Sequence, residues 1–460
     1  MGRSISLSPV TPEGSFYHRR SNRHYRITAG AMRRHQLDGR SQEVNIVEKR
    51  VDFGIGSGNH AKTFVHRSPE GRMVQMPLSF YREGGWQMSP GYDRPDHSDF
   101  RREIGEACLF CHSGGPQPAP IGCSRCHGDG AAHAAQPSRT NIVNPKRLAP
   151  DRALDVCLQC HLETASRGFP DSLRKPGRAV FSFRPGESLA DYKAHFDRSD
   201  GKDRFEVNHA GYRMLQSRCF TESKGAMSCT TCHDPHTAKA RTNACGTCHG
   251  QTEHTRAATD CIACHMPKRR TEDAVHVRMT EHKIVKRPAF TEPTGEDHAG
   301  YDTELTSFFS PAAPPLLELV RLRFKADLNR ATEPDFRRWL SLEPQSPTPM
   351  TALAVRLMLG GKAAEAAPLL ADALKIEPAN LSALNALAIH HASAGRFNEA
   401  LALLERARAA NPDHPLTWIN LGVTREALGE RREAEAAYRE AIRHQPDSTE
   451  ARRRLAALLQ

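Results

Sequence analysis

The pentapeptide Cys-x-x-Cys-His occurs six times between residues 108 and 265. This spacing is typical of c-type haem attachment, in which two thiols close in sequence add to the two vinyl groups of one porphyrin. The histidine that follows is held beneath the iron and binds it through an imidazole nitrogen. The predicted attachment residues are Cys108, Cys111, Cys123, Cys126, Cys157, Cys160, Cys229, Cys232, Cys245, Cys248, Cys261 and Cys264. The predicted proximal iron ligands are His112, His127, His161, His233, His249 and His265.

Other uses of cysteine fit this pattern poorly. Structural zinc takes ligands in groups of four, a thioredoxin-like site needs a single Cys-x-x-Cys without the histidine, and disulfide scaffolds are short and do not repeat one spacing. Twelve of the 13 cysteines belong to the motifs, which leaves Cys219. We therefore expect six c-type haems and no disulfides. Cys219 is either a thiol beside a haem or a small buried residue.

The net charge of +11 belongs to the chain without cofactors. Because each haem adds two propionates, six haems would bring the protein close to neutral. We interpret the excess of Lys and Arg as propionate partners rather than as a nucleic-acid surface, since no nucleic-acid motif accompanies it.

Haem of this kind is attached after export, so we expect a periplasmic or other extracytoplasmic protein. Residues 1–40 contain no apolar signal-peptide core, and no stretch is long and apolar enough to span a membrane. Either the export signal lies upstream of this sequence, which we favour, or the chain is the processed form, or its export is of another kind.

The C-terminal third repeats with a period of 34 residues. Pro344, Pro378, Pro412 and Pro446 follow this spacing, and glycine, alanine and leucine positions share it. The pattern is typical of tetratricopeptide repeats, in which each helix pair is covered by the next pair. We predict such repeats over 346–460, with a capping helix at 448–460 and a protein partner for this domain. Residues 315–345 are a candidate degenerate leading repeat.

The remaining segments are less regular. Residues 1–107 lack motifs, but 44–53 and 63–81 alternate like strands, with a hairpin turn at 68–71. Residues 108–286 form the motif region, and 287–314 are a predicted linker. The expected fold class is mostly α with an irregular multihaem region. An N-terminal multihaem cytochrome c domain with some β structure at its start would precede an α-helical repeat solenoid.

The ligand opposite each motif histidine decides whether an iron is saturated, as in electron carriers, or open to a substrate. Local spacing favours six candidate distal ligands, namely His60, His66, His133, His236, His276 and His282. Each of them has the alternative role of pairing with a propionate or a backbone group. A reserve set consists of His18, His24, His35, His195 and His209. The four histidines of the repeat region are expected at the surface.

Several of these stretches together resemble multihaem cytochromes of the cytochrome c-552/c-554 type, and more closely bacterial proteins that join such a domain to tetratricopeptide repeats. The matching stretches are Tyr17-His-Arg-Arg-Ser, Ser57-Gly-Asn-His-Ala, 88–97, 126–133, 232–236 and Cys264-His-Met-Pro. The resemblance implies closely packed haems with two histidine ligands each and a periplasmic redox role. The chain has no Cys-x-x-Cys-Lys motif, which argues against pentahaem nitrite reductase activity.

Three functions are compatible with these features. The first, which we favour, is an electron-transfer cytochrome whose repeats dock a redox partner. The second is an oxidoreductase acting on a small inorganic nitrogen or sulfur compound at an open haem. Its candidate catalytic residues are Arg19, Arg20, His24 and Tyr25, which could supply protons and positive potential. These arginines could equally pair with propionates. The third is a scaffold in which the repeats are the active part.

Overall fold

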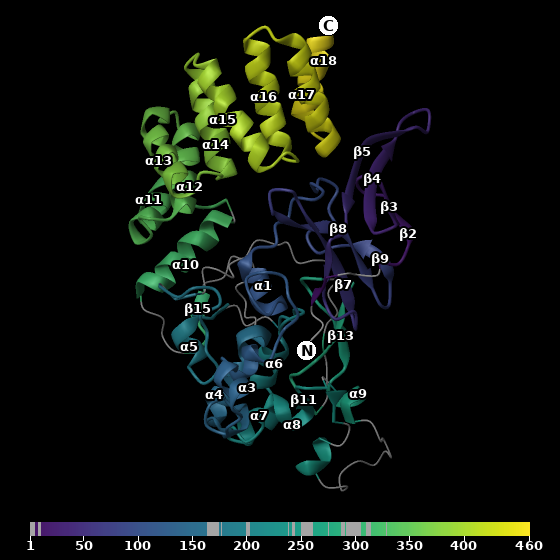
Figure 1. Cartoon of the computed structure of the whole chain (residues 1–460), viewed down its shortest axis with the longest axis vertical. Helices are drawn as coiled ribbons and strands as arrows, with labels where there is room; N and C mark the ends of the chain where they lie inside the picture. Colours follow the sequence, from purple (N-terminus) through teal and green to yellow (C-terminus); the bar gives the residue numbers. More distant parts are fainter. Residues whose placement is uncertain are drawn as a thin grey trace.

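The protein has an N-terminal pair of β-sheets, a central region that carries the motifs, and a curved row of helices at its C-terminal end (Figure 1). This description rests on a computed structural model. It covers residues 5–7, 11–162, 174–175, 177–198, 203–237, 239–241, 244–249, 261–274, 276–286, 290, 305–309, 314–327 and 329–460.

Both N-terminal sheets are antiparallel. One has four strands in chain order, β2 (Gly14–His18), β3 (Arg23–Thr28), β4 (Ala31–Leu37) and β5 (Glu43–Arg50). The other has five strands in the order β1 (Ile5–Ser6), β6 (Phe53–Ile55), β7 (Ala61–Arg67), β8 (Met73–Tyr81) and β9 (Gly85–Met88).

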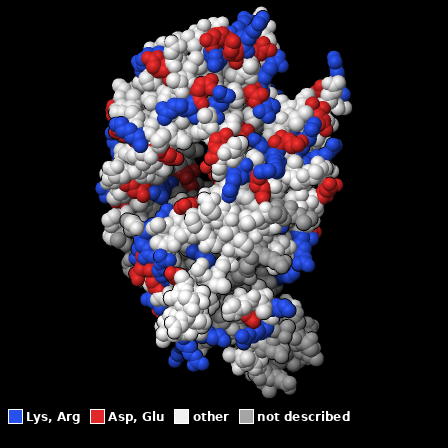
Figure 2. All heavy atoms as spheres, in the orientation of Figure 1, with Lys and Arg blue, Asp and Glu red and all other residues white. Residues whose placement is uncertain are grey.

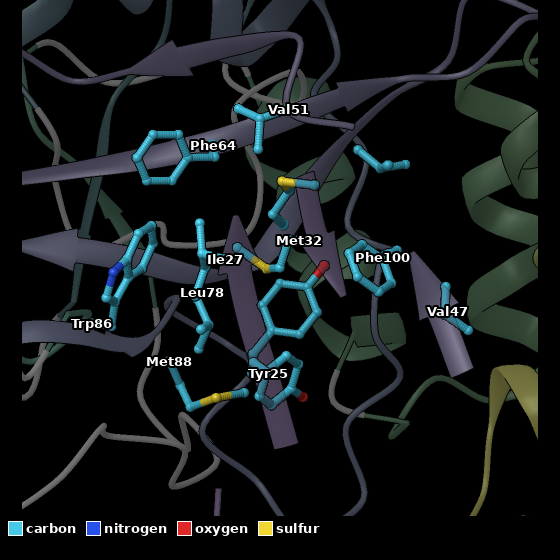
Figure 3. Packing of buried hydrophobic residues seen from close by; sticks show 13 residues of the cluster. Tyr25, Ile27, Met32, Val47, Val51, Phe64, Leu78, Trp86, Met88 and Phe100 are labelled. Atoms are coloured by element: carbon cyan, nitrogen blue, oxygen red, sulfur yellow. The ribbon is translucent and has the colours of Figure 1, made fainter. Parts of the chain in front are cut away.

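The inner faces of the two sheets share one hydrophobic core (Figure 3). Tyr25 and Ile27 on β3 alternate with exposed neighbours, as the two-residue period of a strand requires. They pack with Phe64, Leu78 and Trp86 from the five-stranded sheet. Each fully buried large apolar side chain contributes about 1.5–3 kcal/mol of stability. This core therefore holds the two sheets together.

The predicted strands are confirmed as β5, β7 and β8. In the turn between β7 and β8, the Gly71 amide donates to the Ser68 carbonyl at 2.9 Å. The fold also contains β2–β4, which the sequence pattern did not predict. The alternation there is hidden because Arg23 and Arg34 occupy fully buried positions where an apolar residue is usual.

The central region consists of short helices joined by irregular chain, as expected. Its helices are α1 (Glu106–His112), α2 (Ser124–His127), α3 (Ala131–Ala135), η1 (Pro145–Arg147), α4 (Pro150–His161), α5 (Leu189–Tyr192), α6 (Ala210–Leu215), α7 (Arg218–Glu222), α8 (Cys229–Cys232), η3 (Cys245–Thr247) and α9 (Cys261–His265). Its strand pairs are β10 (Phe196–Arg198) with β15 (Leu305–Ser307), β11 (His233–Asp234) with β12 (Lys239–Ala240), and β13 (Lys268–Arg270) with β14 (Arg278–Thr280). Strand β15 lies inside the predicted linker.

The C-terminal helices form successive antiparallel pairs. They are α10 (Pro314–Asp327), α11 (Glu333–Leu342), α12 (Pro347–Leu359), α13 (Ala363–Ile376), α14 (Leu381–Ser393), α15 (Phe397–Ala410), α16 (Pro415–Ala427), α17 (Arg431–His444) and α18 (Thr449–Leu459). Small residues lie where the helices cross. A Cβ atom added to Gly422 would be 2.4 Å from the buried ring of Tyr438. Helices α10 and α11 lie where the candidate leading repeat was predicted, and α18 lies where the capping helix was predicted.

The row of helices contacts the rest of the protein at both ends. Helix α10 shares a hydrophobic cluster with Phe196 of β10 and Leu305 of β15. At the other end α17 packs against β5, and Lys49 pairs with Asp413 at 2.7 Å. The face in Figure 2 is hollowed between these contacts, and charged side chains of both signs are interspersed over it. None of the helices in the described ranges is long and apolar enough to cross a bilayer.

Candidate haem-attachment sites

Each motif lies on a short helix or a helical turn. The first three motifs end α1, α2 and α4, and the others form α8, η3 and α9. In a helical turn, side chains three residues apart lie on the same face. The two thiols of a motif therefore point the same way, and the following histidine lies beside them. All thirteen cysteines lie in the described parts of the chain and are free thiols.

The third motif lies at the centre of the set. Its Cys160 thiol interacts with Cys111 of the first motif, and mainly for this reason the pKa of Cys160 falls to about 7. Its Cys157 thiol is hydrogen-bonded to Cys229 of the fourth motif, which raises the pKa of Cys157. Cys126 of the second motif interacts electrostatically with both Cys157 and Cys160. Three motifs therefore adjoin the third one.

The row continues from the fourth motif to the sixth. Cys232 of the fourth motif interacts electrostatically with Cys245 of the fifth, and also with Cys219. Cys245 in turn is hydrogen-bonded to Cys261 of the sixth motif. All six motifs thus form one connected set. Cys219, the cysteine outside the motifs, interacts electrostatically with Cys232 of the fourth motif and Cys245 of the fifth.

The motif histidines of the first and third motifs, His112 and His161, lie near one another and are exposed. Desolvation by the surrounding protein, and secondarily the neighbouring His161, lowers the pKa of His112. Desolvation also lowers the pKa of His161, and His282 and His233 add to this effect. A lowered pKa keeps an imidazole neutral at neutral pH, which is the form that binds a metal.

Two motif histidines face a predicted distal ligand. The ring centres of His127 and His236 are 6.1 Å apart and their planes differ by 6°. The rings of His233 and His282 are 6.2 Å apart with 29° between their planes. Two imidazoles on opposite sides of one iron, with each nitrogen about 2 Å from the metal, would place their ring centres about 6 Å apart. Both pairs fit a haem iron between them.

Hydrogen bonds fix which nitrogen of these rings would face a metal. The Nδ1 atoms of His127, His265 and His282 lie 2.8 Å from the carbonyl oxygens of Val143, Val285 and Thr280, respectively. Metal-binding histidines commonly donate their second ring N–H to a carbonyl in this way. In each of the three rings, Nε2 is then the nitrogen left to bind an iron.

Two predicted distal ligands lie in local hydrogen-bond networks. The Nδ1 atom of His133 is 3.0 Å from both the Ser138 carbonyl and the Asn141 side chain. The Nδ1 atom of His66 is 3.0 Å from Asp52. Neither ring lies opposite a motif histidine in the described contacts, so their role as ligands stays a prediction.

His60 and His276 line one small surface pocket. Its lining residues are Asn59, His60, Arg82, Glu83, His276 and Arg278. Burial is the main reason why the pKa of both histidines is lowered. The pocket therefore holds two neutral imidazoles beside two guanidinium groups. Whether either histidine binds an iron stays a prediction as well.

The reserve histidines divide into two groups. His195 and His209 are buried in the central region, whereas His18, His24 and His35 belong to the four-stranded sheet. The rings of His24 and His35 stack with centres 5.2 Å apart. His24 and His35 therefore contact each other within the sheet.

The candidate catalytic residues do not converge on one point. Arg19 and Arg20 are exposed, and Arg20 donates to the Asp93 carbonyl at 3.0 Å. Tyr25 is buried between the sheets, where its hydroxyl donates to Asp99 at 2.7 Å. His24 lies half-buried on the other face of the same strand. Their catalytic role remains a prediction.

A haem iron receives four of its ligands from the porphyrin, so the protein supplies at most two. In the described residues, no three His, Cys, Asp or Glu side chains gather as a metal-ion site would require. Paired thiols on one helical face, imidazoles whose lowered pKa keeps them neutral, and two facing histidine pairs are the arrangement that a c-type haem needs. The residues present therefore fit this group.

Comparison with known proteins concerns the repeats. Two family models, both described as tetratricopeptide repeat, match residues 357–421 and 417–458. Residues 357–458 are tetratricopeptide repeats. Repeats of this kind imply interaction with another protein, so this part of the prediction is confirmed. No curated protein matches the chain.

Solved structures with a likeness to this chain are also repeat proteins. A human IFIT1 dimer with m7Gppp-AAAA is 19% identical, with a TM-score of 0.29, and the match covers 32% of this chain and 37% of that one. MamA protein is 20% identical over 31% of this chain and 78% of its own, with a TM-score of 0.27. TTC0263 of Thermus thermophilus, a thermophilic TPR protein, is 22% identical over 32% and 81%, with a TM-score of 0.28.

Sequence reasoning missed one group of buried charges near the motifs. Arg213, Arg269 and Glu281 are almost fully buried. Both arginines donate hydrogen bonds to the Glu281 carboxylate. Arg213 and Glu281 are 68 residues apart in the sequence. No local pattern marks such a pair, although Glu281 precedes the candidate ligand His282.

Proposed function

We propose that this chain is a periplasmic multihaem c-type cytochrome that binds six covalent haems and transfers electrons, while its repeats dock a protein partner. The observation that carries the proposal is the connected set of six motifs. Because the thiols of neighbouring motifs are hydrogen-bonded or interact electrostatically with one another, the cofactors they bind would also be neighbours. Closely spaced redox centres are what a carrier of electrons requires.

The residues have distinct roles in this proposal. Each cysteine pair would anchor one porphyrin, and the motif histidine would be an iron ligand. His236 and His282 would be the second histidine ligands at the second and fourth motifs, respectively, because they face His127 and His233. A c-type haem supplies an iron that changes between ferric and ferrous states. Two histidines per iron leave no position for a substrate, which favours electron transfer over catalysis at these two sites.

The repeats give the cytochrome a surface for a redox partner. Because they contact the rest of the protein at α10 and at α17, a bound partner would be held in a fixed position relative to the motifs. We propose that this position brings the partner close enough for electrons to pass.

The pocket around His60 and His276 favours a second candidate function. Arg82 and Arg278 outweigh the negative charge of Glu83, and the neutral imidazoles can donate hydrogen bonds to an anion. These are the properties that an oxidoreductase for a small inorganic anion would need beside an open iron. If the protein has this second function, nitrogen and sulfur oxyanions are its candidate substrates.

An electron paramagnetic resonance spectrum of the oxidised full-length protein, with haem counted on the same sample, tests both functions. Six haems that are all low-spin would support the electron carrier. A high-spin signal that shifts on addition of nitrite or sulfite would favour the enzyme. Fewer than six haems per chain would contradict the attachment sites themselves.

A further inference from the structure

A buried cluster of charges lies directly beside a proposed iron ligand. Glu281 has no exposed side-chain surface, and both of its oxygens accept hydrogen bonds from arginines. Arg213 donates to it through Nε at 2.9 Å and through Nη2 at 2.6 Å. Arg269 donates through Nη1 at 2.7 Å. Asp203, which is 42% exposed, pairs with both arginines at 2.5 and 3.2 Å.

This cluster is buried on the side of Glu281 and partly exposed at Asp203, which also interacts electrostatically with Lys283. Two guanidinium groups face two carboxylates. The Arg269 guanidinium also lies 4.8 Å from the ring centre of Phe205 and 4.3 Å from that of Phe290. Because charges are costly to remove from water, a buried ion pair need not stabilise a protein. We therefore interpret the cluster as a device that fixes one local geometry.

The cluster fixes the backbone on both sides of His282. The Glu281 amide donates to the Pro267 carbonyl at 3.0 Å, and the Lys283 amide donates to the Glu281 carboxylate at 2.8 Å. The His282 ring itself is oriented by the Thr280 carbonyl. A ligand held at its own ring and at both neighbouring residues has little freedom to leave its position opposite His233.

We propose that Glu281 is a positioning residue. It holds His282 opposite His233 through Arg213 and Arg269, and its charge sets the electrostatic surroundings of the iron between the two histidines. This inference rests on the proposed function, since it requires a haem at the fourth motif.

The charges of the cluster predict the direction in which the reduction potential should change. Replacing Glu281 by glutamine removes one negative charge and leaves the two arginines with Asp203 as their remaining carboxylate. Reduction takes a positive charge away from the iron, so it becomes more favourable when the surroundings are more positive. Glu281→Gln should therefore raise the reduction potential of one haem.

The test is a redox titration of full-length holoprotein, with haem content and the low-spin resonances measured on the same samples. We expect Glu281→Gln to retain six haems, raise one potential and alter one low-spin signal. The matched control is Glu222→Gln, which changes the same charge at an exposed pair with Arg218 and should leave all potentials unchanged. Unchanged potentials and resonances in Glu281→Gln would overturn the inference.

A second variant covers the case in which Glu281→Gln does not fold. Asp203→Asn removes the same charge from the exposed edge of the cluster, so the protein should still fold. It should shift the same potential in the same direction by a smaller amount. If no potential moves in Asp203→Asn, the electrostatic role of the cluster is wrong.

His282→Ala separates this inference from the proposed function. If no haem becomes high-spin in that variant, the pairing of His282 with the fourth motif fails. If one haem does become high-spin while Glu281→Gln behaves like the wild type, the pairing stands and only the role of Glu281 is rejected.

Discussion

Asp447, which follows the last full repeat helix α17, accepts a hydrogen bond at 2.8 Å from Arg23 in the N-terminal sheet, 424 residues away. Arg23 is fully buried and also donates to Asp99. A second buried arginine, Arg34, shares Asp99 and donates to the carbonyls of Arg443 and His444 at the end of α17. The repeats therefore provide both a counter-charge and carbonyl acceptors for two buried cations of the sheet.

Replacing Asp447 by asparagine should destabilise the protein by about 1–2 kcal/mol, because it leaves the buried Arg23 guanidinium without its second carboxylate. The loss is kept small by the partial exposure of Asp447. Chemical denaturation of the full-length protein measures this change. Asp372→Asn is the control, since Asp372 pairs with Lys375 on the exposed face of α13. Equal stabilities of the two variants would mean that the interdomain pair contributes nothing.

Gly422 marks a close crossing of helices in the last repeat. An added methyl group would clash with the Tyr438 ring at 2.4 Å. We expect Gly422→Ala to lower stability by about 1–2 kcal/mol, because the cost of overpacking exceeds the gain in helix propensity. Thermal melting followed by circular dichroism checks this. Ser393→Ala, at an exposed position of α14, should change little. A stabilised Gly422→Ala variant would show that the crossing can relax.

His236→Ala should convert one of the six haems from low spin to high spin, because its ring lies opposite His127. The haem count should not change, since the thioether bonds do not involve His236. The measurement is electron paramagnetic resonance, with His390→Ala in the repeats as the control. An all-low-spin spectrum in His236→Ala would remove it from the ligand set.

The stability of the protein should fall in mild acid because of His414. Burial, and then repulsion by Arg101 and Arg72, lowers the pKa of His414 to about 4. Its folded pKa lies below the unfolded value, so the neutral ring contributes stability that is present above pH 6.5. That contribution, of up to about 3 kcal/mol, is lost as the pH falls from 6.5 to 4.

His414→Asn tests this pH dependence. The His414 side chain also caps α16 by accepting from the Thr417 amide, and asparagine can keep that cap without titrating. Denaturation at several pH values should give a smaller loss of stability between pH 6.5 and 4 in the variant. Parallel curves for the two proteins would assign the acid sensitivity to other groups.

The sequence predicted the parts of this fold that depend on local spacing. The repeats follow from a period that brings Ala366, Ala400 and Ala434 to equivalent buried positions. The motifs follow from the spacing of two cysteines on one helical turn. The surface position expected for the repeat histidines was wrong for His414 and His444, which are buried. Strands β2–β4 were missed, because buried arginines replace the apolar residues by which a half-buried strand is recognised.

The pairing of residues across the chain could not be predicted. His127 and His236 were both singled out, but nothing in their local sequences indicates that they face each other. The same holds for Arg23 and Asp447, and for Arg213 and Glu281. Such pairs depend on how distant parts of the chain fold against one another, which no periodic pattern in the sequence indicates.

The arrangement of the motifs has a consequence for robustness. The first, second and fourth motifs all adjoin the third through Cys157 and Cys160, while the fifth and sixth extend from the fourth. A branched network of this form has a junction and three ends. If each motif binds a haem as we propose, loss of a terminal haem would shorten one branch, whereas loss of the haem at the junction would divide the network into separate pieces.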